Sequence, residues 1–429
     1  MKILIISKEC AGIALANKLV RQGNRVKIFV QEKGYDEVGN GFGIEKTKDW
    51  QAELQWVGRD GLIIFDYSGF GGLQDSLRKQ GYSIVGGCED GDRLELDRDY
   101  AHQVFSDYGL RTVPLHIFPD ADTAINFLEK DSTEWVLKGN GHADKTFTYV
   151  SKTPDSSDVI DLLRIIRHGM RLSTIVLQRK ISGVEIAVAR FFNGIDWTGP
   201  IEIAIEHKKL FPGDLGPKTS EMGTLIWLDG NENNKLFQGT IQKMRPFLRS
   251  IGFKGKFDIN CIVNEDYIFP LEATPRFGYP ALEMDNVLFE SSMADFLKAV
   301  ADGVHHDLKW LDMVGIVVQI AVPPFPYECK DNKYNSKGLK VYFLNQLSEN
   351  EWEHIHFGEV QKKGEEYILA ASNGYALCVT GVGKTAFEAR KNAYRLTDKV
   401  VIPKMFYRND IGLKFIEKDK DLLHKWGYL

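Results

Sequence analysis

The stretch KFDINCIVNEDYIFPLEATPRFGYP, residues 256–280, predicts two short strands joined by a polar turn. Alternating apolar side chains and β-branched residues favour strands over Lys256–Val263 and Tyr267–Ala273. Such a hairpin brings Asp258 and Glu272 onto neighbouring strands, close enough for one hard cation to bridge them. Mg²⁺ prefers oxygen ligands and commonly combines one or two carboxylates with substrate phosphates. The stretch alone leaves two interpretations open, a metal site or an edge hairpin with solvated acids.

Length and composition indicate a globular protein with several domains. A chain of 429 residues is too long for one hydrophobic core, so we expect two to four domains. Its hydrophobic content of 43% and charged content of 26% are those of ordinary soluble proteins. The formal net charge of −5 argues against nucleic acid as a partner, although a local basic pocket could still bind an anionic substrate.

Cysteine usage and the N-terminus favour the cytoplasm. The five cysteines are scattered and form no CxxC pair, which fits free thiols in a reducing compartment. The N-terminal residues MKILIIS lead directly into a strand without a signal peptide. No apolar run reaches membrane-spanning length, so we expect a cytoplasmic protein without a membrane partner.

The first 92 residues predict a Rossmann-like domain. Strands and helices alternate in this order: Lys2–Ser7, helix Ala11–Gln22, Arg25–Val30, Gly61–Phe65, helix Gly71–Gln80 and Ser83–Val85. This alternation predicts a parallel sheet, which binds ligands at the carboxyl ends of its strands. Those ends are Ser7–Gly12, which lacks the GxGxxG fingerprint of dinucleotide sites, and Asp66–Gly72. The glycines of the second turn, DYSGFGG, either approach a small ligand or serve the turn alone.

The central part predicts a phosphate-binding flap. A boundary at Gly86–Asp92 precedes an amphipathic helix over Leu94–Tyr108. A strand over Trp135–Lys138 then enters the loop GNGHADKT, and a strand over Thr146–Val150 follows. Backbone N–H groups of such a loop can cradle phosphates, and Lys138 would add a point charge.

Further elements of the central part are predicted from periodicity. They are a helix over Asp158–His168, strands over Thr174–Arg179 and Glu185–Phe191, and helices over Leu236–Ile251 and Ala294–Asp302. The loop Lys209–Thr224 carries two prolines and three glycines. We expect it to fold over a ligand, the alternative being a surface loop.

The C-terminal part predicts a mixed domain. Strands are expected at Gly315–Val322, Lys340–Phe343, Glu366–Ser372 and Ala376–Gly381, and a helix over Thr385–Val400 with Thr385 and Glu388 as a capping box. The stretch TGVGKT is no P-loop, because Cys378 stands where the first glycine is needed. His305, His306, His354 and His356 are expected to be solvated or packed rather than metal ligands. The predicted domains are therefore 1–92, 93–305 and 306–429.

Several motifs occur in one order and resemble the ATP-grasp superfamily of ligases. They are Lys138 before a small-residue loop, QRKISGVE at 178–185, and E-A-T-P-R at 272–276. The resemblance implies that Lys138 and Arg98 contact phosphates and that Glu185 holds the ribose. Gln178 would meet the adenine amino group, and the backbone of Arg179, Lys180 and Ile181 the ring edge. The implied metal ligands are Asp258, Glu272 and Thr274.

Within that superfamily the whole chain resembles the phosphoribosylamine–glycine ligase family. The segments that carry this likeness are DLGPKTSEMG at 214–223, RFGYP at 276–280, GYALCVTGVGKTAFEARKNAY at 374–394 and FYRNDIG at 406–412. The resemblance implies an N-terminal Rossmann-like (pre-ATP-grasp) domain, an ATP-grasp domain and a small β-rich C-terminal domain. Substrate contacts are implied for Asp214, Gly216, Pro217, Thr219 and Gly278. Arg276 would be catalytic, stabilising the transferred phosphate or gripping the substrate carboxylate.

The departures from the family pattern lie in the amine half of the site. The family's G-G-R-E turn is replaced by Glu9, Cys10, Ala11 and Gly12, and its G-P-E-x-P-L loop by DYSGFGG. The flap has Asn140, His142 and Asp144 in place of glycines, while Tyr279 and Ala281 replace acids beside the metal site. The nucleotide half is thus kept, and the amine pocket is rebuilt.

The implied activity is ATP-dependent amide formation through an acyl phosphate, with Mg²⁺, or Mn²⁺ in its place, as the metal. Glycine and 5-phosphoribosylamine would give glycinamide ribonucleotide, a step of purine biosynthesis. Two alternatives stay open, a ligase that uses a different amine and a nucleotide-binding relative without turnover. Partners are expected to be small molecules, and the protein a monomer or a homodimer.

Overall fold

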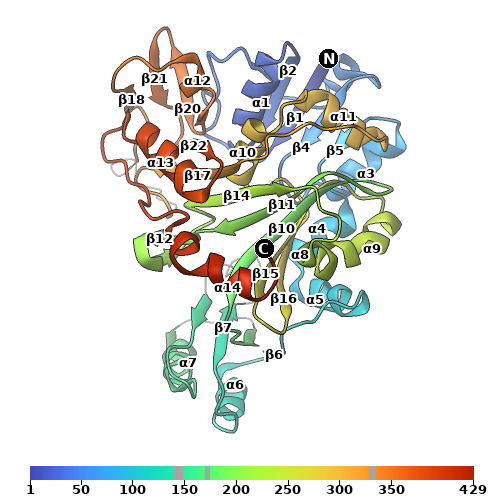
Figure 1. The fold of residues 1–429 in the computed structure, drawn as a ribbon. Helices are drawn as coiled ribbons and strands as arrows, with labels where there is room; N and C mark the ends of the chain where they lie inside the picture. The colour runs from blue at the N-terminus through green and yellow to red at the C-terminus, as the bar shows by residue number, and fades with distance from the viewer. Residues whose placement is uncertain (140–147, 170–173, 328–334) are drawn as a thin grey trace.

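The computed structural model describes residues 1–139, 148–169, 174–327 and 335–429 (Figure 1). Its N-terminal part is a five-stranded parallel sheet in the order β3-β2-β1-β4-β5. The strands are β1 (Lys2–Ser7), β2 (Arg25–Val30), β3 (Glu45–Lys46), β4 (Leu62–Phe65) and β5 (Ile84–Val85), and the helices between them are α1 (Gly12–Arg21), α2 (Leu54–Val57) and α3 (Gly71–Lys79). The buried strands Ile3–Ile6 and Leu62–Phe65 form its core, which confirms the predicted Rossmann-like fold.

An eight-stranded antiparallel sheet forms the centre of the molecule, in the order β16-β15-β10-β11-β14-β17-β22-β19. Its strands are β10 (Val184–Asn193), β11 (Trp197–Glu206), β14 (Gly223–Asp229), β15 (Lys254–Val263), β16 (Ile268–Thr274), β17 (Val314–Ala321), β19 (Ile355–Phe357) and β22 (Tyr375–Gly383). The predicted hairpin is confirmed as β15 and β16 at one edge. The sheet continues across residue 305, so the predicted central and C-terminal domains share one sheet.

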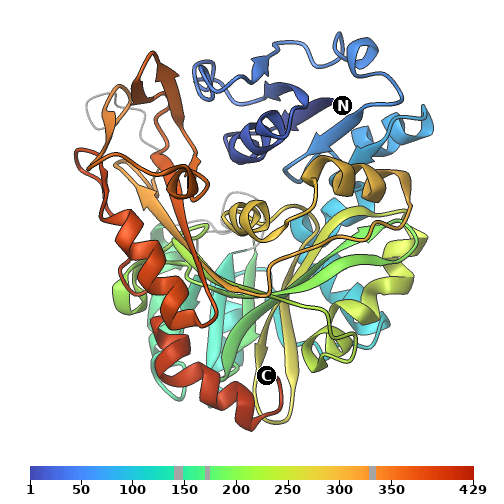
Figure 2. The same cartoon turned by 45° about the horizontal axis from the view of Figure 1, so that its top comes forward.

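Two helices fill the space between the parallel sheet and the large sheet. They are α10 (Ala281–Leu288) and α11 (Met293–Asp302), and Figure 2 shows α10 between the two layers. Met284, Leu288 and Phe296 share one apolar core with residues of β1 and β10. The sequence gives no sign of α10, because three of its polar residues are buried and its apolar periodicity is lost.

The other face of the large sheet is covered by helices from distant parts of the chain. These are α5 (Arg98–Asp107), α9 (Arg245–Ser250), α13 (Ala386–Thr397) and α14 (Lys420–Lys425). Their apolar side chains, among them Phe105, Leu248 and Ala389, pack with Val188 and Ile316 of the sheet.

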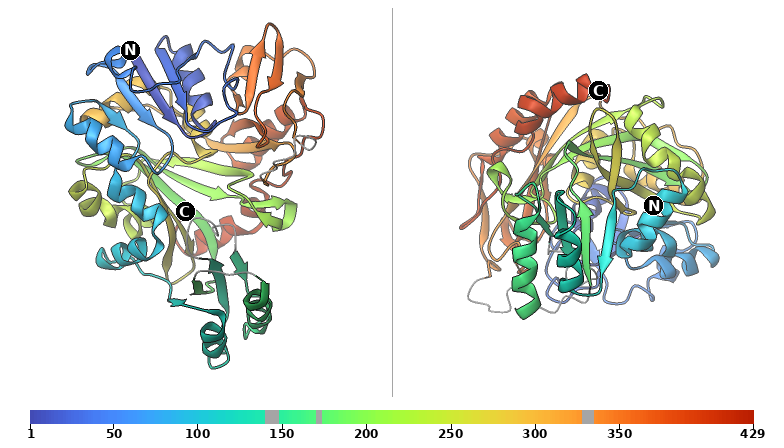
Figure 3. Two further views of the ribbon diagram at one scale, coloured as in Figure 1. Left: turned by 180° about the vertical axis from the view of Figure 1, so that it is seen from behind. Right: turned by 90° about the horizontal axis from the view of Figure 1, so that it is seen from below.

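A smaller four-stranded sheet, β6-β9-β7-β8, projects from the rest of the molecule (Figures 1 and 3). It comprises β6 (Leu115–Phe118), β7 (Trp135–Gly139), β8 (Thr148–Val150) and β9 (Ile175–Arg179), with α6 (Ala121–Leu128) and α7 (Ser157–Gly169) packed on one face. The predicted flap residues Asn140, His142 and Asp144 lie outside the described residues.

The helix predicted over Leu94–Tyr108 is wrong. The chain forms α4 (Glu89–Leu96), which begins inside the predicted boundary, and α5, with Asp97 between them. Asp97 has an extended backbone (φ −120°, ψ 100°), and its carboxylate accepts a hydrogen bond from the Tyr100 N–H at 3.1 Å. An aspartate at this place starts a new helix instead of continuing the old one.

The helix predicted over Leu236–Ile251 is also broken. It divides into α8 (Lys235–Gly239), the 3₁₀ turn η3 (Ile241–Met244) and α9. Thr240 leaves the helical region (φ −124°, ψ −103°). Pro246 stands in the first turn of α9, where its missing N–H costs nothing.

The C-terminal part adds a second small sheet and a different capping box. β18 (Lys340–Phe343), β20 (Val360–Lys363), β21 (Glu366–Leu369) and β23 (Val400–Val401) form this sheet. Thr385 caps α13, accepting from the Glu388 N–H at 3.2 Å, but the Glu388 carboxylate accepts from the N–H of Lys384 instead of Thr385. The reciprocal pair of a capping box is formed by Ser348 and Glu351, at the start of α12 (Glu349–Trp352).

Two negative expectations concern metals and membranes. His354 and His356 both hydrogen-bond the hydroxyl of Thr380, at 2.9 and 3.0 Å, and no group of three His, Cys, Asp or Glu residues in the described ranges could hold a metal alone. Across the same ranges, every helix is too short or too polar to span a bilayer.

Candidate active site

A cavity of about 1200 Å³ opens between the small sheet, the large sheet and the carboxyl edge of the parallel sheet. All the site residues predicted from the sequence line it except Gly216 and Pro217. These lining residues are Arg98, Lys138, Gln178, Arg179, Lys180, Ile181, Glu185, Asp214, Thr219, Asp258, Glu272, Thr274, Arg276 and Gly278. The cavity therefore gathers residues from segments that are far apart in the chain.

Lys138 and Arg98 form a cationic cluster on the side of the cavity next to the small sheet. Lys138 stands on β7, and its ammonium donates a hydrogen bond to the side-chain oxygen of Gln178 on β9. Burial, and then the nearby Arg98 guanidinium, lower the pKa of Lys138 to about 8. Burial also lowers the pKa of Arg98, whose Nη1 atom is buried without a hydrogen-bond partner among the described residues. Bound phosphate would supply the negative charge that these groups need.

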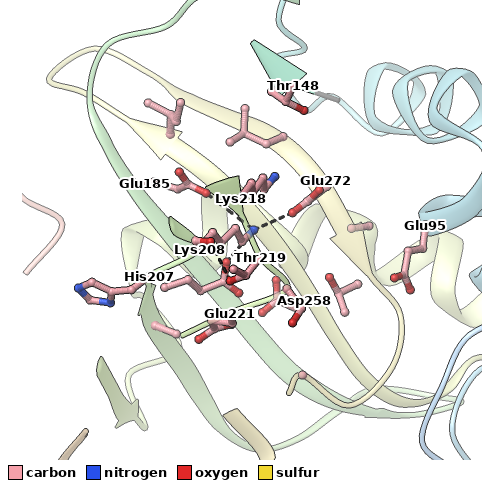
Figure 4. Close-up of a pocket in the computed structure, with 18 of the residues that line it drawn as sticks. Glu95, Thr148, Glu185, His207, Lys208, Lys218, Thr219, Glu221, Asp258 and Glu272 are labelled. Atoms are coloured by element: carbon pink, nitrogen blue, oxygen red, sulfur yellow. Dashed lines mark hydrogen bonds and ion pairs between the residues drawn. The ribbon is translucent and has the colours of Figure 1, made fainter. Parts of the chain in front are cut away.

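Carboxylates gather around the ammonium of Lys208 (Figure 4), and one of them, Glu272, is near enough to raise the pKa of both Lys138 and Arg98. The Nζ atom of Lys208 lies 2.8 Å from oxygens of Glu206 and Glu272 and 3.8 Å from Glu185. Burial lowers the pKa of Lys208, but the three carboxylates outweigh it and raise the pKa well above its ordinary value. Lys208 in turn lowers the pKa of Glu272.

The hairpin pairs the predicted metal ligands in register. Asp258 lies opposite Thr274, and Asn260 lies opposite Glu272. Burial and the charge of Glu206 raise the pKa of Asp258 to about 8. The carboxylates of Asp258, Glu206 and Glu272 repel one another, so a hard divalent cation would bind among them favourably. Water and phosphate oxygens would complete the coordination of that cation.

The predicted adenine hinge connects the two sheets at the end of β9. The backbone N–H groups of Arg179 and Lys180 donate to the carbonyls of Pro114 and Glu134, both at 2.9 Å. The Lys180 ammonium is held by the carboxylate of Glu134 at 2.5 Å. Any hydrogen bond from these two residues to a ligand ring must therefore use other groups.

Arg276 follows the hairpin and forms a bidentate ion pair with Glu95 of α4. The two N···O distances are 2.9 and 3.2 Å. Burial lowers the pKa of Arg276, but Glu95 outweighs it and the net shift is upward. Glu95 stands apart from the carboxylates around Lys208 (Figure 4). Arg276 thus lines the cavity, and the carboxylate of Glu95 already neutralises its charge.

The segment predicted as a long loop is a β-hairpin. β12 (Lys209–Phe211) and β13 (Leu215–Lys218) pair, and the buried Arg408 anchors their turn through Asp214 Oδ1 at 2.9 Å. Gly216 has φ 79°, and a Cβ there would lie 2.6 Å from the Phe211 ring. Gly216 is therefore required by the turn, while Asp214 lines the cavity from it.

Among the charged residues that line the cavity and were missed from the sequence are Glu206, Lys208, Lys218 and Glu221. Glu206 ends β11 and Lys208 follows two residues later, at the same sheet edge as Glu185. A run of charges directly after an alternating strand was the signal available. Glu221 is buried, and burial and the charge of Glu206 raise its pKa.

Two models of one protein family match the chain. The ATP-grasp (A) domain of phosphoribosylglycinamide synthetase matches residues 96–280, and its C domain matches residues 318–414. The chain belongs to the phosphoribosylglycinamide synthetase family. The first match contains the hairpin and the cationic cluster of the cavity, so the family assignment covers the site itself.

Curated relatives span nearly the whole chain. A phosphoribosylamine–glycine ligase of Halalkalibacterium halodurans is 26% identical over 91% of this chain and 87% of its own length. The enzyme of the same name from Helicobacter pylori is 23% identical over 97% of both chains. The family is thus one of ATP-grasp ligases.

Solved structures of low identity confirm the fold. The phosphoribosylamine–glycine ligase of Thermotoga maritima superposes with a TM-score of 0.70 at 19% identity, covering 96% of this chain and 100% of the other. The biotin carboxylase domain of a Hydrogenobacter thermophilus 2-oxoglutarate carboxylase gives 0.66 at 10% identity, covering 99% and 98%. That structure is a complex with MgADP, ADP and bicarbonate.

Proposed function

We propose that the protein is an ATP-dependent carboxylate–amine ligase that forms an amide through an acyl phosphate. The observation that carries this proposal is the division of charge within one cavity. Lys138 and Arg98, whose positive charges burial disfavours, face Asp258 and Glu272 on the hairpin. Phosphate groups with a bridging divalent cation would satisfy both sides at once.

ATP and Mg²⁺ are the ligands that these residues fit. Asp258, Glu272 and Thr274 would hold Mg²⁺, or Mn²⁺ in its place, and Lys138 and Arg98 the phosphates. Bound Mg²⁺ supplies neutralisation of phosphate charge. The nucleoside would lie along β9 and β10. Gln178 and the hinge that follows it would contact the adenine, and Glu185 would contact the ribose.

The reaction has two steps. A carboxylate oxygen of the first substrate bonds to the γ-phosphorus of ATP, the bond from that phosphorus to the bridging oxygen breaks, and ADP leaves. The amine nitrogen then bonds to the acyl carbon, phosphate leaves with the electrons of the C–O bond, and the nitrogen loses a proton. The contribution of the protein is to position the reactants and match their charge, and to exclude water from the acyl phosphate.

Glycine and 5-phosphoribosylamine are the first substrates to test, since the relatives are named for them. The substrate contacts proposed for Asp214, Thr219, Gly278 and Arg276 would then lie at the end of the cavity next to the parallel sheet. A different amine is a second candidate, favoured by the aspartates that occupy the turns after β1 and β4.

The test is release of ADP by the purified protein with ATP and Mg²⁺. Release that requires glycine, with acyl phosphate trapped by hydroxylamine as glycine hydroxamate, supports the ligase. Binding of ATP without ADP release or hydroxamate, for glycine and every other amino acid tried, contradicts it and indicates a nucleotide-binding relative.

A further inference from the structure

One end of the cavity, here called the amine arm, is built by the carboxyl edge of the parallel sheet. Glu9, Cys10 and Ala11 reach it from the end of β1, and Asp66 and Tyr67 from the end of β4. In parallel α/β sheets this edge binds ligands, and the helix that follows each strand offers free backbone N–H groups to anions such as phosphate. The contacts of those helix starts therefore show what kind of ligand the arm can take.

The start of α1 is occupied by a carboxylate of the protein. Asp66 lies so close to Gly12, the first residue of α1, that a Cβ there would be 2.6 Å from Asp66 Oδ2. The Gly12 N–H is among the groups that stabilise this carboxylate, and Ser7 donates a hydrogen bond to Oδ2 at 2.6 Å. A phosphate at this position would meet a negative charge instead of free N–H groups.

The start of α3 is filled in the same manner. The N–H groups of Gly69 and Gly71 both donate to Asp92 Oδ2, at 2.8 and 2.6 Å. Asp92 comes from α4 and is itself buried. The turns after β1 and β4, which line the amine arm, are thus both occupied by the chain's own aspartates.

The charges that line the amine arm are also unsuited to an anion. Glu9, Asp66 and Glu95 line it together with Arg276, and the ammonium of Lys8 lies beside it, 3.5 Å from the Tyr67 hydroxyl, so acidic side chains outnumber the basic ones. Each nitrogen of the Arg276 guanidinium already donates a hydrogen bond within the protein. Nε and Nη2 donate to Glu95, and Nη1 donates to the Phe277 carbonyl. The lysines that line the cavity come from other elements: the small sheet and its hinge, the surroundings of β12 and β13, and Lys414 near the C-terminus.

Asp66 also presents an acceptor that no protein group uses. Its side chain is only 3% exposed, and within the described ranges its Oδ1 atom has no hydrogen-bond partner. A buried carboxylate oxygen without a partner is costly, so a donor from a ligand in the arm would be favourable. An ammonium group is a donor of this kind and brings the opposite charge.

We infer that the amine partner of this ligase is a small unphosphorylated amine, which the carboxylates of Asp66 and Glu9 bind as a cation. This inference rests on the proposed ligase function and names its second substrate by chemical class. The bound ammonium must lose one proton before its nitrogen attacks the acyl carbon, and Asp66 lies where it can accept that proton.

The test compares matched pairs of amines in the ADP-release assay with the full chain, ATP, Mg²⁺ and glycine. Ethanolamine and phosphoethanolamine differ only in the phosphate, as do ribosylamine and 5-phosphoribosylamine formed in place from ammonia and the sugars. 1,3-Diaminopropane adds a second cationic group. We expect the unphosphorylated member of each pair to give at least about tenfold higher kcat/KM.

Variants locate the effect. Asp66→Asn keeps the shape and the acceptor for Ser7, and should lower kcat/KM for the amine at least about tenfold while ATP affinity stays unchanged. Glu9→Gln should act in the same direction. Asp60→Asn makes the same chemical change at an exposed residue outside the cavity and serves as the control.

Failure of the inference can be told apart from failure of the ligase function. Glycine hydroxamate with hydroxylamine, together with turnover of 5-phosphoribosylamine but not of its unphosphorylated partner, overturns the inference and leaves the ligase intact. Equal turnover of both members in the wild type and in Asp66→Asn also overturns it. Absence of both hydroxamate and ADP release, for glycine and every other amino acid tried, would instead contradict the ligase itself.

Discussion

The Nζ atom of Lys208 lies 2.8 Å from a carboxylate oxygen of Glu272, two residues 64 positions apart in the chain. An ammonium of the protein thus binds the acid that the hairpin offers to a metal. Without a bound cation, Lys208 keeps the carboxylates of Glu206 and Glu272 together. A metal held by Glu272 would compete with Lys208 for that carboxylate.

Replacing Lys208 with methionine should destabilise the protein and make Mg²⁺ stabilising. Three carboxylates would lose their common counter-charge, which we expect to cost about 1–2 kcal/mol of unfolding free energy. Thermal denaturation of Lys208→Met with and without Mg²⁺ measures both effects. A melting temperature equal to the wild type, with the same response to Mg²⁺, would contradict the role given to Lys208.

Glu272→Ala should abolish Mg²⁺-dependent turnover and leave the fold intact. The hairpin keeps its backbone pairing, but the metal loses one of its two carboxylates, so we expect kcat to fall at least about a hundredfold. Glu265→Ala removes an exposed acid from the turn of the same hairpin and is the control. Wild-type rates in Glu272→Ala would rule out the proposed metal site.

The affinity for ATP should fall as the pH rises through about 8. Burial and Arg98 lower the pKa of Lys138 to that value, so the ammonium is charged below it and neutral above it. Loss of this charge should weaken ATP binding about tenfold between pH 7 and 9.5. Lys138→Arg stays charged over this range and should bind ATP with little pH dependence. Identical pH profiles in the two proteins would contradict this account.

Stability should also depend on pH through a buried pair between α10 and β19. Burial raises the pKa of Glu283 to about 8, and burial lowers the pKa of His356, 3.4 Å away, to about 3. The unfolded glutamic acid has an ordinary pKa near 4.5, so the folded state holds the extra proton and stability falls as the pH rises from there to about 8. His356 acts oppositely, but only below about pH 6.5.

The window between pH 6.5 and 8 therefore excludes His356, and the share of Glu283 in the loss of stability there is on the order of 2 kcal/mol. Glu283→Gln should remove that share, which urea denaturation at the two pH values measures. An unchanged pH dependence in the variant would show that Glu283 is ionised in the folded protein.

The parts of the site that could be predicted are those formed by residues close together in the sequence. Alternation marked β15 and β16, and their short turn fixed which strand faces which, so Asp258 and Glu272 could be placed together. Lys208 could not be found this way, since its partners come from β10 and β16, strands that are distant in sequence. Asp97 shows another limit, because one capping side chain divided a helix whose periodicity was continuous.

The contacts of the N-terminal turns were equally hidden. The sequence showed that Glu9–Gly12 and DYSGFGG departed from the family pattern, but not what replaced it. Only the fold brings Asp66 to the start of α1 and Asp92 to the start of α3. Side-chain contacts to backbone N–H groups across a sheet edge leave no periodic trace in a sequence.

The central claim, that this cavity activates a carboxylate with ATP, is tested most directly by trapping the acyl phosphate. Purified protein is mixed with ATP, Mg²⁺, glycine and hydroxylamine, and glycine hydroxamate and ADP are measured together. The structure predicts equal amounts of both products, dependent on glycine and Mg²⁺ and absent in Glu272→Ala. ADP without hydroxamate, or products that persist in Glu272→Ala, would contradict the assignment.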